Sequence, residues 1–287
     1  MRKLLLQLDT SPHASVFDRV VAYDGGADEV MSYGGVTPEA VRELAHGCIF
    51  TRGPKDLHHT AIFIGGTDMA AGEALLAAVH GAFFGPMRVS VMLDSNGSNT
   101  TAVAAVARLE QAAGGVDGKR AVITAGTGPV GARAAGLLAS RGADVVMTSR
   151  RLDHAQQVAG ATRKRFGGSI AAVHMSGAAE APKALEGASL LLNAGGAGIC
   201  LVPKDAWAGR QGLLAVADVN AVPPLGIEGV EVTDNGASRD GAMAFGALGV
   251  GNLKMKIHKA CIAHLFERND LVLDAETIAA LAREMAS

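Results

Sequence analysis

Residues 126–131 read Gly-Thr-Gly-Pro-Val-Gly, and this G-x-G-x-x-G spacing lies between a β-rich segment, 119–125, and an alanine-rich segment of helical period. In a turn from strand to helix, the first glycine permits the tight turn and the second lets the backbone approach a pyrophosphate. The third lets the helix pack closely on the sheet. The loop therefore predicts a dinucleotide site made of Gly126, Thr127, Gly128, Pro129, Val130 and Gly131. Because 37 of the 287 residues are glycine, a structural turn without a ligand is the alternative.

Charges, apolar runs and cysteines exclude several other classes of protein. The 26 Lys and Arg residues nearly balance 28 Asp and Glu, for a net charge of −2, so no global field attracts nucleic acid. The apolar run Leu4–Leu6 is too short for a signal peptide, and no later stretch of about 18 apolar residues predicts a membrane span. The three cysteines match neither a disulfide nor a zinc pattern, and the nine histidines lack ligand spacing. We expect a cytoplasmic protein without a metal, membrane or nucleic-acid partner.

Short β-rich runs alternate with longer helical segments along the chain, which predicts an α/β protein. Gly114-Gly115 ends a helix, so we expect a first domain at 1–115 and a Rossmann domain with a parallel sheet at 116–251. Helices within 252–287 are expected to return to the first domain. In the first domain we expect strands at 3–8, 19–23, 47–50, 61–65 and 88–93, and helices at 38–45, 69–83 and 99–113. In the second we expect strands at 119–125, 144–151, 169–174, 188–193 and 213–218.

The end of the second strand of the Rossmann domain selects the dinucleotide. NAD-binding enzymes carry an Asp or Glu there, about 20 residues beyond the glycine loop, to hold the ribose hydroxyls. This chain has Thr148, Ser149, Arg150 and Arg151 instead. Two guanidinium groups and nearby hydroxyls suit a 2′-phosphate, so Ser149, Arg150 and Arg151 favour NADP. The alternative is a pair of solvated charges at a helix entrance.

Loops after the later strands are expected to line the nicotinamide end of the site, because ligands lie beyond the carboxyl ends of parallel strands. Ala194 and Gly195 follow one buried strand and offer bare backbone. Asp218 and Asn220 follow the next strand, before a Pro-Pro pair. Ordinary connections between strand and helix are the alternative for both segments.

Polar residues of the first domain are candidates for a substrate site. The stretch 94–101 contains Asp94 and, beyond it, Asn96, Ser98, Asn99 and Thr100. One of these caps the helix that follows, but a cap needs only one such residue. Asp18, before an expected strand, and Asp24, after it, are further candidates. Lys256 stands on a helix after the glycine-rich segment 245–251, which we expect to be flexible; a solvated surface lysine is its alternative.

Several runs of the sequence resemble one family, the NADP-dependent methylenetetrahydromethanopterin dehydrogenases of methylotrophic bacteria, in particular the type that also acts on methylenetetrahydrofolate. The resemblance covers nearly the whole chain. The runs that carry it are FDRVVAYDGGAD (17–28), TRGPK (51–55), TAIFIGGTDMAAGE (60–73), FFGPMRVSVMLDSNGSNTTA (83–102), AGTGPVG (125–131), NAVPPLGI (220–227) and FGALGVGNLKMKIHKACI (245–262). One departure is Arg150-Arg151 where we expect Arg-Lys, which keeps both charges.

The resemblance implies a first domain like that of amino-acid dehydrogenases, a cleft that holds NADP and the pterin, and a homotrimer. It also implies reversible hydride transfer from the methylene carbon to NADP. Hydride departure leaves a cation shared by two nitrogens, so no general base is required. We expect Asp94 and Lys256 to be the catalytic residues. Asp94, together with Asp218, would favour the developing charge, and Lys256 would orient the pterin.

Two other functions fit parts of the sequence. A shikimate-dehydrogenase-like enzyme that oxidises a hydroxyl needs a lysine and aspartate pair, for which Lys55 and Asp94 are candidates. A non-catalytic NADP-binding redox sensor is the second alternative. A Tyr-x-x-x-Lys pair is absent, since Ala27 follows Tyr23 and Thr37 follows Tyr33 at that spacing, so cyclohydrolase activity is not expected.

Overall fold

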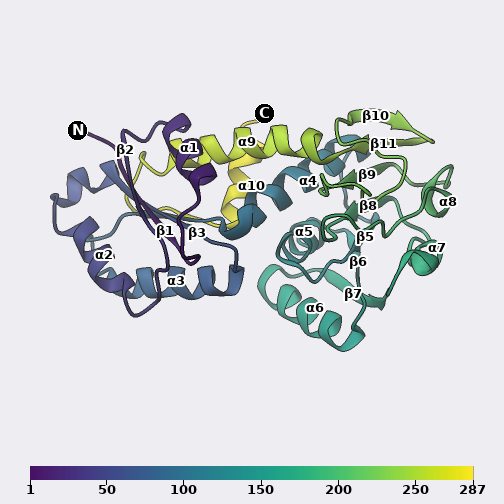
Figure 1. Cartoon of the computed structure of the whole chain (residues 1–287), viewed down its shortest axis with the longest axis horizontal. Helices are drawn as coiled ribbons and strands as arrows, with labels where there is room; N and C mark the ends of the chain where they lie inside the picture. Colours follow the sequence, from purple (N-terminus) through teal and green to yellow (C-terminus); the bar gives the residue numbers. More distant parts are fainter. Residues whose placement is uncertain (287) are drawn as a thin grey trace. The chain divides into compact units, whose positions relative to one another are not determined.

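The computed structural model describes residues 1–286, which form two compact units (Figure 1). The first unit joins residues 1–100 to the residues from 255 onward, and the second contains residues 101–254. Both divisions fall within helices, α4 (Ser98–Ala113) and α9 (Ala247–His264). The sequence places the boundaries at 115/116, where Gly114-Gly115 ends a helix, and at 251/252, after a glycine-rich segment.

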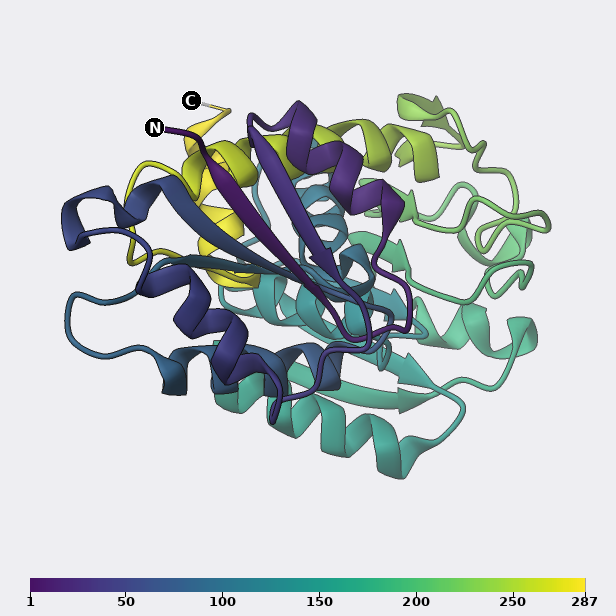
Figure 2. The ribbon, with the colours of Figure 1, turned by 60° about the vertical axis from the view of Figure 1, so that its left-hand side comes forward.

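The first unit is built on a parallel five-stranded sheet in the order β12-β4-β3-β1-β2. The strands are β1 (Leu4–Asp9), β2 (Glu29–Tyr33), β3 (Thr60–Gly65), β4 (Ser90–Leu93) and β12 (Val272–Leu273). Its helices are α1 (Val16–Asp24), α2 (Val41–Ile49), α3 (Met69–Ala82) and α10 (Ala275–Glu284), with short 3₁₀ turns at Pro54–His59 and Ser95–Gly97. Helices α2 and α3 pack together on one face (Figures 1 and 2). Every residue of the central strand β3 is buried.

Two strands expected in this unit are wrong, because both segments are helical. Residues 19–23 lie in α1, where Ser15 caps the helix by accepting a hydrogen bond from the Asp18 N–H. Residues 47–50 fall in the last turn of α2 and its cap. Their β-branched and aromatic side chains resemble a strand only locally, since the turn before α1 and the neighbours of α2 decide the conformation.

Other elements of this unit shift or were not expected. Helix α2 begins three residues after the expected start, because the Thr37 carbonyl accepts hydrogen bonds from the Ala40 and Val41 N–H groups in a turn. Strand β2 was missed because it is an edge strand, in which only Val30 is buried. Helices α3 and α4 lie where they were expected, and the Asp68 carboxylate caps α3.

The second unit is a doubly wound sheet in the order β10-β11-β9-β8-β5-β6-β7. Its strands are β5 (Arg120–Thr124), β6 (Asp144–Ser149), β7 (Ser169–His174), β8 (Leu190–Asn193), β9 (Ala215–Asp218), β10 (Asn235–Arg239) and β11 (Ala242–Phe245). The helices are α5 (Pro129–Ala139), α6 (Leu152–Phe166), α7 (Ala181–Ala184) and α8 (Lys204–Trp207). Six parallel strands follow the Rossmann order, and β10 pairs antiparallel at the edge. The predicted α/β class is confirmed.

The segment 245–251 is not the flexible connection that its glycines predict. The Gly246 N–H donates to the Asp234 carbonyl at 2.8 Å, and the Leu248 N–H donates to the Val232 carbonyl at 2.9 Å. A Cβ atom on Gly249 would overlap the Asp234 carbonyl. These glycines permit close packing at the start of α9. Over residues 1–286, no helix has both the length and the apolar character needed to cross a membrane.

Candidate dinucleotide site

The glycine loop between β5 and α5 has the geometry that its spacing predicts. Gly126 turns the chain out of the sheet, and its N–H donates to the Thr148 carbonyl of β6 at 3.0 Å. A Cβ atom on Gly131 would lie 2.7 Å from the Gly126 Cα, so only glycine fits where the helix crosses the loop. A Cβ atom on Gly128 would have no neighbour closer than 3.8 Å. The first and third glycines therefore serve packing, and the second leaves the backbone open to a ligand.

Helix α5 starts directly on this loop, with Gly128 as N-cap and Pro129 as the first helical residue. The N–H groups of the first helical turn, including those of Val130 and Gly131, have no intrahelical acceptor. Together with the helix dipole they favour an anion at this end. The loop thus provides the groups that a pyrophosphate needs.

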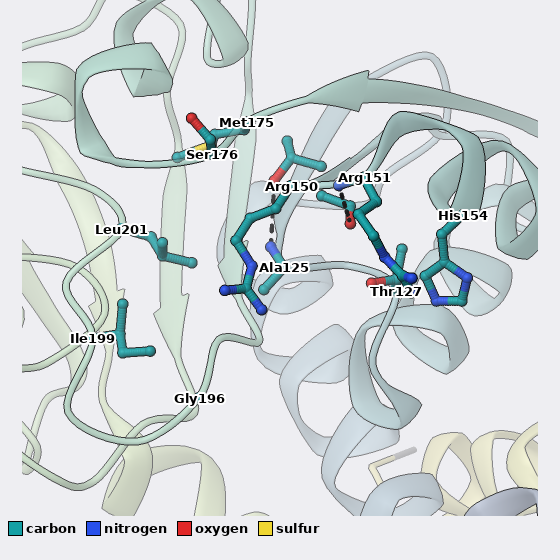
Figure 3. A pocket seen from close by; sticks show the side chains of 12 residues that line it. Ala125, Thr127, Arg150, Arg151, His154, Met175, Ser176, Gly196, Ile199 and Leu201 are labelled. Carbon is teal, nitrogen blue, oxygen red and sulfur yellow. Dashed lines mark hydrogen bonds between the residues drawn. The ribbon is translucent and has the colours of Figure 1, made fainter.

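A hollow of about 590 Å³ lies beside the glycine loop (Figure 3). Its lining comes from loops that follow four neighbouring parallel strands, which is the ligand edge of a doubly wound sheet. The main lining residues are Thr127 after β5; Ser149, Arg150, Arg151 and His154 after β6; Met175 and Ser176 after β7; and Gly196, Ile199 and Leu201 after β8. Sequence reasoning selected the first four of these and the segment 193–199 that contains Gly196 and Ile199. It missed His154, Met175, Ser176 and Leu201. The sequence feature that could have indicated His154, Met175 and Ser176 is their position soon after the strands β6 and β7.

The polar end of the hollow carries positive charge. Arg150 and Arg151 are both exposed, and both line the hollow (Figure 3). Aspartate and glutamate are absent from the residues given above for its lining. The position where NAD enzymes place a carboxylate for the ribose hydroxyls therefore carries two cations, which suits a 2′-phosphate.

Asn193, the first residue of the segment 193–199 that the sequence places at the nicotinamide end, holds the loop after β8. Its Oδ1 accepts from the Thr124 hydroxyl at 2.8 Å and from the Gly195 N–H at 3.3 Å. Its Nδ2 donates to Asp218 Oδ1 at 2.8 Å. Asn193 is fully buried at the end of β8. Through it, the ends of β5, β8 and β9 position Ala194 and Gly195 beside the hollow.

Asp218 and Asn220, which the sequence places at the cofactor, make hydrogen bonds within the chain. Asp218 is 1% exposed, and its carboxylate also accepts from the Asn220 N–H and the Ile227 N–H, both at 2.9 Å. Asn220 Oδ1 accepts from the Val222 N–H at 2.9 Å. A buried carboxylate with three donors inside the chain shapes the loop around the cis Pro223-Pro224 bond, so these residues support the site from behind.

The polar stretch after β4 is also largely internal. Asp94 is fully buried; it accepts from the Thr100 N–H at 3.0 Å and the Thr100 hydroxyl at 2.6 Å, and His258 Nδ1 lies 4.0 Å away. The Ser98 hydroxyl donates to the Ser95 carbonyl, and Asn99 Nδ2 donates to the Leu93 carbonyl at 2.6 Å. The catalytic role expected of Asp94, and the substrate contacts expected of Ser98, Asn99 and Thr100, do not fit this burial. These side chains hold the turn between β4 and α4.

Other candidates of the first unit remain accessible. Asn96 is exposed, with a left-handed backbone (φ 56°), and its N–H donates to the Gly66 carbonyl. Asp18 lies in the first turn of α1 and Asp24 at its end, so neither flanks a strand as expected. Asp24 forms an ion pair with Lys259 at 2.8 Å. Lys256 is exposed on α9, whereas Lys254 is buried.

Cys200 lies next to two lining residues of the hollow, and burial raises the pKa of its thiol. Within residues 1–286, no cluster of three His, Cys, Asp or Glu side chains is arranged to hold a metal ion.

The sequence is similar to proteins of known name. A family model described as "Methylene-tetrahydromethanopterin dehydrogenase, N-terminal" matches residues 16–96. The NAD(P)-dependent methylenetetrahydromethanopterin dehydrogenase of Methylorubrum extorquens is 32% identical over 294 residues, which cover 99% of each chain. The chain belongs to the methylenetetrahydromethanopterin dehydrogenase family. A second protein of that organism, named bifunctional protein MdtA, is 54% identical over 286 residues and again covers 99% of each chain.

Solved structures share the fold at much lower identity. The ligand-free 5-ketofructose reductase of Gluconobacter sp. strain CHM43 has a TM-score of 0.54 and 17% identity over 99% of each chain. Shikimate 5-dehydrogenase of Listeria monocytogenes, in complex with shikimate and NAD, has a TM-score of 0.55 and 14% identity, covering 100% of this chain and 96% of its own. At these identities the likeness concerns architecture alone.

Proposed function

We propose that this member of the family transfers a hydride from the methylene carbon of methylene-tetrahydromethanopterin, or of methylene-tetrahydrofolate, to NADP in one-carbon metabolism. The products are the methenyl pterin and NADPH, and the reaction is reversible. The observation that carries the proposal is the pair Arg150 and Arg151 at the end of β6, in a hollow beside the glycine loop. The likeness over the full length to a relative named for this activity supports it.

The residues present fit NADP. The open backbone at Gly128 and the start of α5 would hold the pyrophosphate, and Arg150 and Arg151 would hold the 2′-phosphate. When bound, NADP supplies the carbon that accepts the hydride. Ala194 and Gly195, held by Asn193, would leave room at the nicotinamide end because they carry little side chain.

The chemistry asks for positioning more than for proton transfer. The carbon that loses a hydride lies between two nitrogens, so the charge spreads over both and no proton leaves that carbon. The protein must bring the reacting carbons to roughly 3 to 3.5 Å and keep water from the methenyl product. Buried networks such as those of Asp94 and Asp218 serve this purpose because they fix the loops at the strand ends.

Lys256, Asn96, Asp18 and Asp24 are the side chains that we propose for the pterin. A lysine charge beside the reacting carbon would oppose the developing cation, so Lys256 would orient the pterin by a hydrogen bond away from that carbon. We expect Lys256→Ala to raise KM for the pterin or lower kcat, and Lys183→Ala, an exposed lysine on α7, to change neither. If Lys256→Ala leaves both constants unchanged, Lys256 has no place in the site.

The positions of Lys55 and Asp94 argue against the shikimate-dehydrogenase-like alternative, which needs the two side chains close together. Lys55 precedes β3, at the amino end of the sheet, and Asp94 follows β4, at the carboxyl end. β3 and β4 are parallel neighbours, so a strand length of roughly 20 Å separates the two residues. They cannot exchange a proton through one substrate hydroxyl.

An absorbance assay tests the function directly. Purified protein with NADP and either methylene pterin is expected to form NADPH and the methenyl pterin together, in equal amounts. Comparing kcat/KM for the two pterins identifies the preferred one. The absence of reaction with either pterin would refute the proposal, and NADP binding without reaction would favour a sensor.

We further propose that the protein works in the cytoplasm as a homotrimer, as the family resemblance implies. Light scattering in solution is expected to give three times the mass of the chain. A monomeric mass at the enzyme concentrations of the assay would refute the trimer.

A further inference from the structure

His154 lines the hollow beside the two arginines but has no part in the site derived above. It is the third residue of α6, and Arg151 is the N-cap of that helix. Residues three apart on a helix share a face. Figure 3 shows the His154 ring and the Arg151 guanidinium on the same side of the hollow, near Thr127, with Arg150 across from them. His154 is half-buried, so its ring is partly covered and still open to a ligand.

The charges around His154 favour an anion. Arg150 and Arg151 line the same hollow, and α5 behind it carries Arg133. The two carboxylates nearest in the chain, Asp153 and Glu180, do not line the hollow themselves. Asp153 is exposed on α6, and Glu180, beyond β7, contacts His174 at 3.4 Å and accepts hydrogen bonds from Ser176. The imidazole therefore lines a wall whose charged neighbours in the hollow are cations.

We propose that His154 is the third contact of the 2′-phosphate of NADP, and that its ring takes up a proton from solvent when NADP binds. This inference rests on the proposed function, which places NADP in the hollow. An anion beside an imidazole favours the protonated form, which then donates a charge-assisted hydrogen bond to a phosphate oxygen. NAD carries a hydroxyl at this position and provides no such anion.

The consequence is a cofactor preference that depends on pH. Arginine keeps its charge at every accessible pH, whereas histidine changes its charge within the physiological range. The contribution of His154 to discrimination between NADP and NAD therefore falls as the pH rises from 6 to 8.5. A lysine at position 154 would keep its charge over this range and would remove the dependence.

Calorimetric titrations of NADP and NAD test the inference without any turnover. The wild type, His154→Gln and His154→Lys are each titrated at pH 7 in two buffers of different ionisation enthalpy, which reports the protons exchanged. For NADP the wild type is expected to take up a fraction of a proton more than either variant, because ionisation of the 2′-phosphate itself is common to all three. For NAD the three proteins are expected to agree.

Affinities at pH 6 and 8.5 complete the test. His154→Gln is expected to weaken NADP binding by about fivefold at pH 6 and by less than about twofold at pH 8.5. His154→Lys is expected to bind NADP at pH 8.5 at least as well as the wild type, and NAD binding serves as the check that each variant is folded.

Equal proton exchange in the wild type and His154→Gln, or equal NADP affinity at pH 6, would overturn the role of His154 while NADP binding itself stands. A wild type that binds neither dinucleotide would instead overturn the proposed function and, with it, this inference.

Discussion

Replacing Asp218 by Asn tests whether the buried network behind the hollow holds its loops. Asp218 Oδ1 accepts from Asn193 Nδ2 at 2.8 Å and from the Asn220 N–H at 2.9 Å, and Oδ2 accepts from the Ile227 N–H at 2.9 Å. An asparagine has the same shape but presents an NH₂ group at one of these positions, so at least one buried donor loses its acceptor. Such a donor costs about 1 to 3 kcal/mol, and the lost charge assistance adds roughly 1 kcal/mol. Asp218→Asn is therefore expected to lower the free energy of unfolding by about 2 to 4 kcal/mol.

Urea unfolding followed by tryptophan fluorescence measures this effect. Trp207 is the single tryptophan, and it is fully buried in the same unit. With a slope of roughly 2 kcal/mol per M urea, the midpoint is expected to fall by about 1 to 2 M. Glu186→Gln, on an exposed residue of that unit, is the control and is expected to leave the midpoint unchanged. Equal midpoints for Asp218→Asn and the wild type would refute a network that depends on this carboxylate.

Three further predictions concern the glycine loop, pH and thiol reactivity. Gly131→Ala would place a Cβ atom 2.7 Å from the Gly126 Cα, so the loop must shift, and KM for NADP is expected to rise about tenfold or more; an unchanged KM would contradict the packing argument. Partial desolvation, together with the charge of Arg88, lowers the pKa of His80, an exposed residue of α3, below its usual value of 6.5, so the unfolded chain binds this proton at a higher pH than the folded chain does. Stability should accordingly decline below about pH 6.5, and His80→Gln should lose less of its urea midpoint between pH 7.5 and 5.5 than the wild type; equal losses would contradict this. Cys200 is half-buried whereas the other two cysteines are buried, so a disulfide reagent at pH 8 is expected to modify one thiol per folded chain, and Cys200→Ser should abolish that reaction. Rapid modification of a second thiol would count against it.

Local patterns predicted those parts of the fold in which neighbours along the chain agree with the tertiary structure. Gly126, Gly128 and Gly131 lie on the turn that their spacing predicts, and α3 begins at the expected residue, with Asp68 as its cap. The strands predicted at 19–23 and 47–50 were wrong because β-branched and aromatic side chains suit a strand or a buried helix face equally well. In such short runs, packing against the rest of the unit selects the conformation.

The residues of the candidate site were likewise partly predicted from the sequence and partly missed. Arg150 and Arg151 were found because a charge at a known distance from the glycine loop has a local signal. His154, Met175 and Ser176 were missed because they reach the hollow only when three parallel strands bring their carboxyl ends to one edge.

The sequence by itself determined the α/β class, the dinucleotide loop and the family, because each depends on residue types at short, fixed spacings. Only the tertiary structure decided which polar residues line the hollow and which are buried within the chain. Asp94 and Asp218 read as site residues in the sequence, yet both are buried and hold several donors within the chain. The sequence does not distinguish a carboxylate that contacts a ligand from one that supports a loop. The difference lies in how many buried N–H groups surround the carboxylate, and residues distant in sequence supply those groups.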